Sequence, residues 1–140
     1  MPKTLHHLAH LRGALAAAAM IPLMACAGDE TLSAYGAAGK TWELSQIDGT
    51  AFAATATLEF PAPGQIAGQA PCNAYRAEIT APYPWFDASN LAATRAVCPE
   101  LLEETRYLKA LQSMSEAEVA GDVLILRNEA GRELVFTAGG

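Results

Sequence analysis

The stretch "GQAPCNAY", Gly68 to Tyr75, interrupts a region that otherwise has the character of a β-strand. Pro71 has no N–H to donate to a sheet ladder, so it predicts a bulge or an edge position at this point. Asn73 is expected to bond the irregular backbone through its side chain. Cys72 could be a nucleophile, a metal ligand or one half of a disulfide, and each interpretation implies a different kind of protein.

The distribution of histidine narrows this choice. All three histidines of the chain lie within its first ten residues. Cys72 therefore has no histidine base, and neither a Ser-His-Asp or Cys-His pair nor a histidine metal site can form in the rest of the chain. After Cys26, the cysteines are Cys72 and Cys98, and two thiolates fall short of the four ligands of a structural zinc site. We therefore expect no catalytic residue, no metal site and no cofactor.

The first residues have the pattern of a signal peptide. The segment "GALAAAAMIPLMA", Gly13 to Ala25, is uncharged and follows a start that contains Lys3 and Arg12 but no acid. A basic start followed by a short apolar core is typical of a signal peptide. The core is shorter than the roughly 18 to 20 apolar residues of a membrane-spanning helix. Residues 1–25 are therefore predicted to be a lipoprotein-type signal peptide, with a buried N-terminal helix as the alternative.

The end of this core predicts a lipid anchor. "LMAC", Leu23 to Cys26, resembles a bacterial lipobox, in which the cysteine becomes the acylated N-terminus. Ala25-Cys26-Ala27 also fits an A-x-A site for ordinary secretory cleavage, so both cleavages stay open. Ala27 directly after the cysteine resembles the outer-membrane sorting pattern of Gram-negative bacteria. We expect lipidation of Cys26 and a location in the cell envelope, at the periplasmic face of the outer membrane.

Composition divides the remainder into a tether and one domain. Residues 26–40 are small, polar and glycine-containing, which is typical of a flexible tether. Residues 41–138 are enough for one domain with a single core. The chain has 15 acidic residues against 9 basic residues. This net negative charge argues against a nucleic-acid partner and against electrostatic binding to anionic membranes.

The two domain cysteines are expected to form a disulfide. In an exported protein, a pair of cysteines most simply forms a bridge. A Cys72–Cys98 bond would stabilise the fold by about 3 to 4 kcal/mol through loop closure. Two free buried thiols are an alternative, and so is chemistry at Cys72.

Most of the domain is predicted to consist of short strands. The expected strand regions are 41–49, 54–60, 64–80, 85–94 and three segments between 116 and 138. Asp48-Gly49 predicts a hairpin turn. The apolar run Val123–Leu126 predicts a central strand that is covered on both faces.

One helix is predicted over Cys98 to Met114, "CPELLEETRYLKALQSM". Pro99 suits the first helical position, and Glu100, Glu103 and Glu104 stand where the helix dipole favours solvated anions. The expected core face comprises Leu101, Thr105, Tyr107, Leu108, Leu111 and Met114. The predicted fold class is α+β, with a strongly curved antiparallel sheet and one helix packed on it.

Four segments occur in order over Lys40 to Ala138: "TWELSQIDG", "GQIAGQAPCNAY", "LAATRAVCPELLEETRYLKAL" and "GDVLILRNEAGRELVF". In these segments the chain resembles the META/HslJ-like domain family. The resemblance implies a cracked-barrel-like sheet with one helix. It also makes Asn73, Tyr75, Thr94 and Arg95 motif residues with a structural or binding role. The resemblance further implies an envelope lipoprotein, because many members of the family are envelope lipoproteins associated with stress response, antibiotic tolerance or secretion. The family has no established enzymatic activity.

Three functions follow as expectations. The first is a non-catalytic binding or adapter module, lipid-anchored to the membrane, with an unidentified envelope protein as its partner. The second is a carrier or sensor of a small apolar ligand in a cavity between helix and sheet. The third is an enzyme that uses carboxylates alone, which would require two acids to converge in a pocket.

Overall fold

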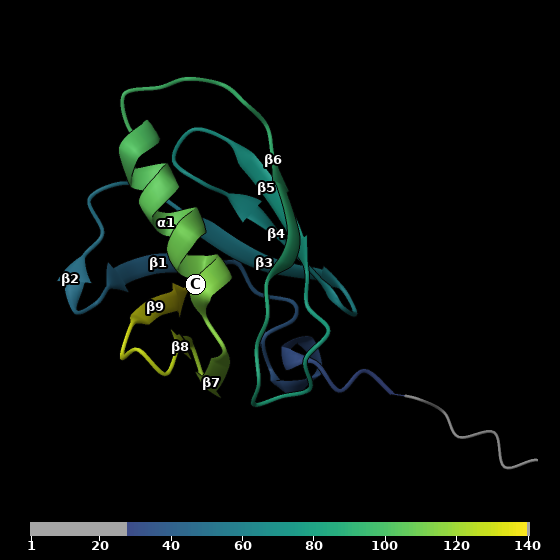
Figure 1. The fold of residues 1–140 in the computed structure, drawn as a ribbon. Helices are drawn as coiled ribbons and strands as arrows, with labels where there is room; N and C mark the ends of the chain where they lie inside the picture. The colour runs from purple at the N-terminus through teal and green to yellow at the C-terminus, as the bar shows by residue number, and fades with distance from the viewer. Residues whose placement is uncertain (1–27, 140) are drawn as a thin grey trace, which may run out of the picture.

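The structure is a computed structural model and describes residues 28–139 (Figure 1). A short 3-10 helix, η1 (Leu32–Tyr35), comes first. The elements that follow are β1 (Trp42–Ile47), β2 (Thr50–Ala51), β3 (Thr57–Ala62), β4 (Gln65–Gln69), β5 (Ala74–Glu78), β6 (Ser89–Ala93), α1 (Leu101–Ser113), β7 (Glu116–Ala120), β8 (Val123–Arg127) and β9 (Glu133–Ala138). No helix in this part of the chain is long and apolar enough to cross a membrane.

The strands form one antiparallel sheet in the order β6-β5-β4-β3-β1-β9-β8-β7, and β2 pairs with β1 alone. The sheet curls until its two ends approach each other. Trp85, which precedes β6, forms a bridge to Glu116 of β7. The N–H of Phe86 donates to Ser115 O at 2.9 Å, and the N–H of Ala117 donates to Pro84 O at 2.8 Å. The predicted class, a strongly curved antiparallel sheet with one helix, is confirmed.

The β1–β2 connection shows how local sequence sets the hairpin. Asp48 and Gly49 both have positive φ, at 51° and 76°, and Ile47 pairs with Thr50 across them. Two consecutive positive φ angles match the right-handed twist of the flanking strands, which is why Asp-Gly is favoured in such a turn. The predicted turn is confirmed.

The core lies between the concave face of the sheet and α1, which crosses it as Figure 1 shows. The large side chains that are almost fully buried include Trp42, Ile47, Leu58, Tyr107, Leu111, Leu124, Leu126 and Phe136. Tyr107 meets Phe136 edge to face, with the ring centroids 6.4 Å apart. Such a pair adds a directional contact to the hydrophobic burial.

The buried face of the helix overlaps the predicted one only in part. Its buried residues are Glu104, Tyr107, Ala110 and Leu111, and Met114 follows them at the C-cap. Leu101 and Thr105 are exposed, and Leu108 is half-buried. The predicted stripe is therefore confirmed at Tyr107, Leu111 and Met114, and half-buried Leu108 packs against the core. It is wrong at Leu101 and Thr105, and it omitted the buried Glu104. Pro99 also lies two residues before the helix, which begins at Leu101 after an N-cap at Glu100.

Two further predictions need correction. β8 alternates between buried and partly exposed side chains, with Val123 exposed, so one face of this strand is covered and not both. Within the predicted tether, Leu32 and Ala37 are fully buried in the core. The indole N–H of Trp42 donates to Ala37 O at 2.8 Å. The folded domain therefore begins before residue 41, because this segment supplies apolar side chains and a backbone acceptor to the core.

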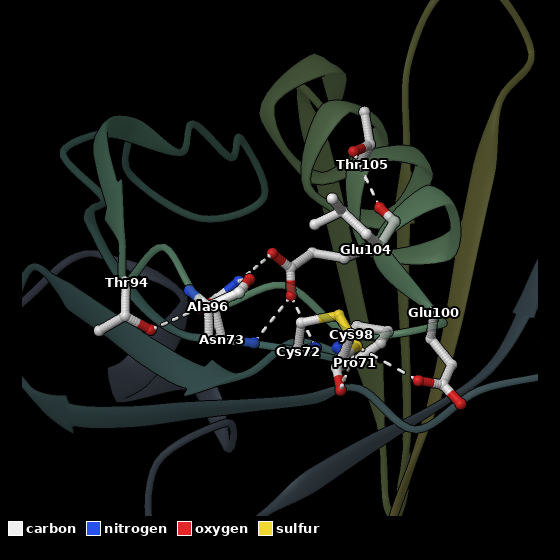
Figure 2. Close-up of a disulfide and its surroundings, with 10 residues drawn as sticks. Pro71, Cys72, Asn73, Thr94, Ala96, Cys98, Glu100, Glu104 and Thr105 are labelled. Carbon is white, nitrogen blue, oxygen red and sulfur yellow. Dashed lines mark hydrogen bonds between the residues drawn. A yellow bond between two sulfur atoms is a disulfide. The ribbon is translucent and has the colours of Figure 1, made fainter.

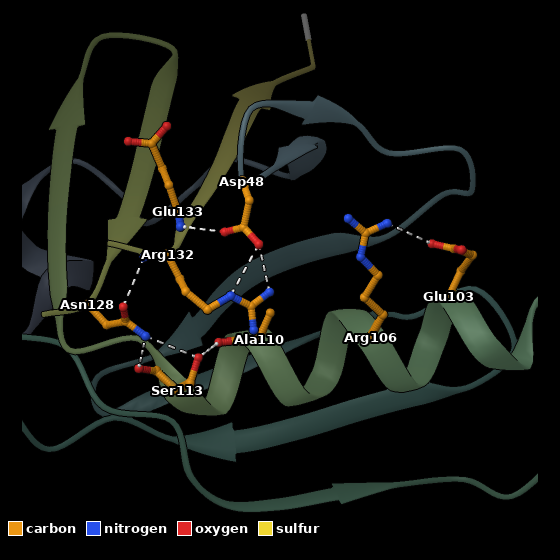
Figure 3. Close-up of polar contacts among 8 residues, drawn as sticks. All are labelled: Asp48, Glu103, Arg106, Ala110, Ser113, Asn128, Arg132 and Glu133. Atoms are coloured by element: carbon orange, nitrogen blue, oxygen red, sulfur yellow. Dashed lines mark hydrogen bonds and ion pairs between the residues drawn. The ribbon is translucent and has the colours of Figure 1, made fainter. Parts of the chain in front are cut away.

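The C-terminal end of α1 is tied to the sheet by polar contacts (Figure 3). The Asp48 carboxylate accepts a hydrogen bond from the N–H of Glu133 at 3.0 Å and from the Arg132 guanidinium at 2.9 Å. These bonds hold the pKa of Asp48 below its ordinary value, with the Arg132 hydrogen bond as the largest cause. The Asn128 side chain donates to Ser113 O at 3.1 Å. The β1–β2 turn, the β8–β9 turn and the helix end are therefore linked to one another.

Candidate functional site

Pro71, Cys72 and Asn73 lie at the N-terminal end of α1 (Figure 2). Residues 70–73 form the turn between β4 and β5, where Gln69 pairs with Ala74 and the N–H of Ala70 donates to Asn73 O at 2.8 Å. Pro71 therefore occupies a hairpin turn and not a bulge or an edge. Proline fits there because the second position of a turn requires no N–H donor.

Cys72 and Cys98 are joined in a disulfide, with their Cα atoms 5.6 Å apart. The bond connects the β4–β5 turn to the loop that enters α1, so it links the sheet to the helix start. Sequence reasoning predicted this pairing, and the structure confirms it. Cys26 lies outside the described residues.

Glu104 is the centre of the site. It is 5% exposed, and its Oε2 accepts hydrogen bonds from the N–H groups of Cys72 at 2.7 Å and Asn73 at 2.8 Å. Its Oε1 accepts from Nδ2 of Asn73 at 2.7 Å. The interpretation of Glu104 as a solvated glutamate is wrong. A carboxylate can be buried here because it accepts charge-assisted hydrogen bonds and lies near the positive end of the helix dipole.

Asn73 completes this network. Its Oδ1 accepts hydrogen bonds from the N–H of Ala96 at 2.6 Å and from the hydroxyl of Thr94 at 2.9 Å. Its Nδ2 also donates to Ala96 O at 3.0 Å. With the bond to Glu104, both donors and both acceptor sites of the amide are in use. The expectation that Asn73 bonds irregular backbone is confirmed, and this side chain joins the turn, the loop after β6 and the helix.

The motif tyrosine forms a second buried network below the first. The hydroxyl of Tyr75 donates to Thr57 O at 2.7 Å and lies 2.6 Å from the hydroxyl of Tyr107. Burial raises the pKa of both phenols, so each stays protonated and serves as a hydrogen-bonding group. Gly68 permits this approach, because a Cβ at this position would lie 2.0 Å from Thr57 O and 2.8 Å from the Tyr75 hydroxyl.

The predicted motif residues therefore divide into two groups. Asn73, Tyr75 and Thr94 take part in the networks, whereas Arg95 is exposed beside them. Sequence reasoning missed Glu104 and the requirement for glycine at Gly68. The available signal was spacing, because Glu104 stands three residues before Tyr107 and seven before Leu111, on the same helix face.

A metal could approach this site only through the cysteines. The sulfur atoms of Cys72 and Cys98 and a carboxylate oxygen of Glu100 lie within 4.8 Å of one another. Thiolates, however, are the metal-binding form of cysteine. The disulfide removes both of them. Cys98 Sγ lies 3.2 Å from Glu100 Oε2, and because a disulfide sulfur has no proton to donate, this approach is a contact only.

Three apolar side chains are exposed around the start of α1. Val97 is 84% exposed, Leu102 is 78% exposed, and Leu101 is also exposed. We call these three residues the apolar cluster. A shallow groove of about 350 Å³ lies over β5 and β6 and is lined by Ala74, Tyr75, Arg76, Ala92, Ala93 and Thr94. Cys98, which follows Val97, is held by the disulfide, and Glu104 of the same helix accepts three hydrogen bonds from the β4–β5 turn. The segments that carry the apolar cluster are therefore anchored to the sheet.

Comparisons with known proteins agree with this fold. A family model described as META domain matches residues 35–139. A solved NMR structure of a protein from Burkholderia xenovorans is 22% identical, with a TM-score of 0.62 over 92% of this chain and 99% of that chain. A crystal structure of a DUF4847 family protein from Bacteroides vulgatus is 12% identical, with a TM-score of 0.57 over 74% and 94%. Comparison with curated proteins found no match.

Proposed function

The chain belongs to the META domain family, and from this premise we propose that it is a cell-envelope lipoprotein whose domain binds a protein partner without catalysing a reaction. Cys26 carries the lipid in this proposal, and the periplasmic face of the outer membrane is the location. The partner is an envelope protein that docks on the apolar cluster. The link to stress response, antibiotic tolerance or secretion is part of the same proposal.

The observation that carries the binding role is the exposure of Val97, Leu101 and Leu102 on a rigid support. Exposed apolar side chains that stand close together mark interaction surfaces more often than isolated ones do. A surface that is already ordered loses less conformational entropy on binding. The disulfide and the Asn73–Glu104 bonds supply that order here.

The other two functions have less support. The space between helix and sheet is filled by Tyr107, Leu111 and Phe136, all fully buried, so nothing there favours an apolar ligand. For carboxylate catalysis, Glu104 would have to be free to exchange protons with a substrate. Its oxygens instead accept three hydrogen bonds from the turn, which suits a structural group better than a catalytic one.

The binding role can be tested by site-specific crosslinking in the envelope. A photoreactive amino acid at position 97 or 102 should give a discrete adduct with one protein. The same probe at Val123, an exposed apolar residue of β8, serves as the matched control and should give none. The double variant Val97→Ser with Leu102→Ser should weaken binding of the identified partner while its thermal unfolding matches that of the wild type.

Two results would count against the proposal. Absence of any adduct at both cluster positions would contradict the proposed docking surface.

For the anchor, metabolic labelling with a fatty-acid analogue should mark the wild type and not Cys26→Ser. A wild-type protein that takes up no label and has Gly28 as its N-terminus would mean ordinary secretory cleavage instead.

A further inference from the structure

The end of the domain that carries η1 has an exposed aromatic surface. Tyr35 is 51% exposed and Trp85 is 56% exposed. The ring of Tyr83 stacks on Tyr35, with the centroids 4.7 Å apart and the planes inclined by 15°. We call Tyr35, Tyr83 and Trp85 the aromatic cluster. In Figure 1, η1 lies at the end of the domain opposite the loop that enters α1. Val97 belongs to that loop, and Leu101 and Leu102 begin the helix.

These aromatic residues are held in place by backbone pairing. The N–H of Tyr83 donates to Glu30 O at 2.8 Å, so the loop before β6 is bonded to the first described segment. Trp85 is fixed by its bridge to Glu116 where the sheet closes. Tyr83 and Trp85 also line a groove of about 370 Å³ whose floor includes Ile125. The exposed rings are therefore presented by ordered backbone.

The aromatic cluster lies where the chain would leave its lipid anchor. Asp29 follows Cys26 by three positions along the chain, and an extended chain spans at most about 3.6 Å per residue. Three residues of chain reach about 11 Å at most, so a lipid attached to Cys26 would be tethered close to Asp29. Asp29 is itself fixed to the domain start, because its carboxylate accepts hydrogen bonds from the N–H of Thr31 at 2.9 Å and from Ser33. A lipid on Cys26 would hold this end of the domain against the bilayer.

We propose that the aromatic cluster rests in the headgroup region of the membrane that holds Cys26, so that the apolar cluster faces away from the bilayer toward its partner. This inference rests on the proposed lipid anchor. Tyrosine and tryptophan suit the position because their amphipathic rings partition to the membrane–water interface. The proposal accounts for the exposure of these rings, which the docking of a protein partner on the apolar cluster leaves unexplained.

The charges around the aromatic cluster identify the kind of bilayer. Asp29, Glu30, Glu116 and Glu118 lie on the same or adjoining segments. Arg127, the cation that lines the groove, is already paired with Glu118 and Glu133, each at 2.9 Å. An acidic surround is repelled by anionic lipid, so the surface fits a zwitterionic headgroup layer.

The test uses the full lipidated protein in phosphatidylcholine vesicles with bromine on the acyl chains, which quenches nearby tryptophan. Trp85 is the exposed tryptophan, whereas Trp42 is fully buried in the core. We expect quenching by the brominated lipid, a blue shift of the emission, and loss of quenching by aqueous iodide. Trp85→Phe should abolish all three changes. Adding anionic phosphatidylglycerol to the vesicles should weaken them.

The matched control moves the reporter to the other end. Leu102→Trp in the Trp85→Phe background should stay accessible to iodide and unquenched by brominated lipid. Vesicle flotation separates the two proposals. If the protein floats but Trp85 stays accessible to iodide, or if the lipid quenches the reporter introduced at position 102, the orientation is wrong while the anchor stands. If the protein neither floats nor carries lipid on Cys26, the anchor fails and the orientation fails with it.

Discussion

The turn at residues 70–73 and the loop at residues 80–87 both leave the sheet, and each is held by one carboxylate. In the turn, Glu104 accepts the N–H groups of Cys72 and Asn73 from more than thirty positions away, in a site closed to solvent. In the loop, Asp87 accepts the N–H groups of Thr80 at 2.7 Å and Ala81 at 2.8 Å from six or seven positions away.

The difference lies in what could replace each carboxylate. Water can reach the N–H groups around Asp87, which is only half-buried, so loss of this carboxylate leaves donors that solvent can satisfy. Water cannot reach the groups around Glu104 to the same extent, because that side chain is enclosed by the helix and the turn. A buried donor without an acceptor costs its full desolvation free energy. The hydrogen bonds to Glu104 should therefore contribute much more to the free energy of unfolding than those to Asp87.

The largest expected effect is at Glu104. Glu104→Ala leaves two backbone N–H groups and one amide donor without their acceptor, and we expect it to lower the free energy of unfolding by about 3 to 5 kcal/mol. Denaturant titration measures this value. Glu100→Ala is the matched control, since Glu100 is exposed and its side chain makes no capping bond, and it should change stability by less than about 0.5 kcal/mol. Equal losses of stability from Glu104→Ala and Glu100→Ala would contradict a special role for the buried carboxylate.

A smaller loss is expected when the disulfide is removed. Cys72→Ala with Cys98→Ala should lower stability by about 2 to 4 kcal/mol, because the unfolded chain regains the entropy of an open loop. The fold should persist, since Glu104 still joins the turn to the helix. Combining this pair with Glu104→Ala should give a non-additive loss, because both brace the same turn. Simple additivity would show that the bond and the carboxylate act independently.

The smallest effect is expected at Asp87, where we predict that Asp87→Asn costs about 0.5 to 1.5 kcal/mol at neutral pH. Burial alone would raise the pKa of Asp87, but hydrogen bonds from Ala81 and Thr80 outweigh it and lower the pKa below its ordinary 3.8. A lowered folded-state pKa stabilises the protein above about pH 4, and this stabilisation is lost as pH falls through the folded-state value.

The stability of wild type and Asp87→Asn should therefore converge in acid, as followed by thermal unfolding between pH 7 and pH 2. Asp48 and Asp29 also have lowered pKa values, so the variant should retain part of the acid sensitivity. A difference between wild type and Asp87→Asn that is constant down to pH 2 would mean that the ionised carboxylate is not the source of the effect.

Local patterns predicted much of this molecule correctly. The Asp48-Gly49 turn follows from backbone preference at two adjacent residues. The disulfide follows from there being two domain cysteines in a chain expected to be exported. The strands of the C-terminal half follow from apolar segments separated by turn residues. The turn and the strands are decided by interactions between residues close in sequence, and the disulfide is decided because each domain cysteine has one available partner.

The site was less predictable because its central residue acts across the fold. A glutamate in the first turns of a helix fits the helix dipole whether it faces solvent or the core. An offset of one residue rotates a helix by about 100°, so spacing alone placed Leu101 and Thr105 on the same broad face as Tyr107 and Leu111. The sheet narrows that face, because it offers the turn's N–H groups to Glu104 and the Tyr75 hydroxyl to Tyr107.

By itself, the sequence determined the place of the helix between the early strands and the last three, the pairing of Cys72 with Cys98, and the family to which the chain belongs, since these depend on local preference or on a unique partner. The tertiary structure decided which face of α1 is buried, that residues 32–37 belong to the core, and that the sheet closes at Trp85 and Glu116. The physical reason is that a polar side chain can be buried only where its hydrogen-bond partners are buried with it. Whether Glu104 is a solvated charge or the acceptor for a turn depends on donors that only the assembled sheet brings within reach.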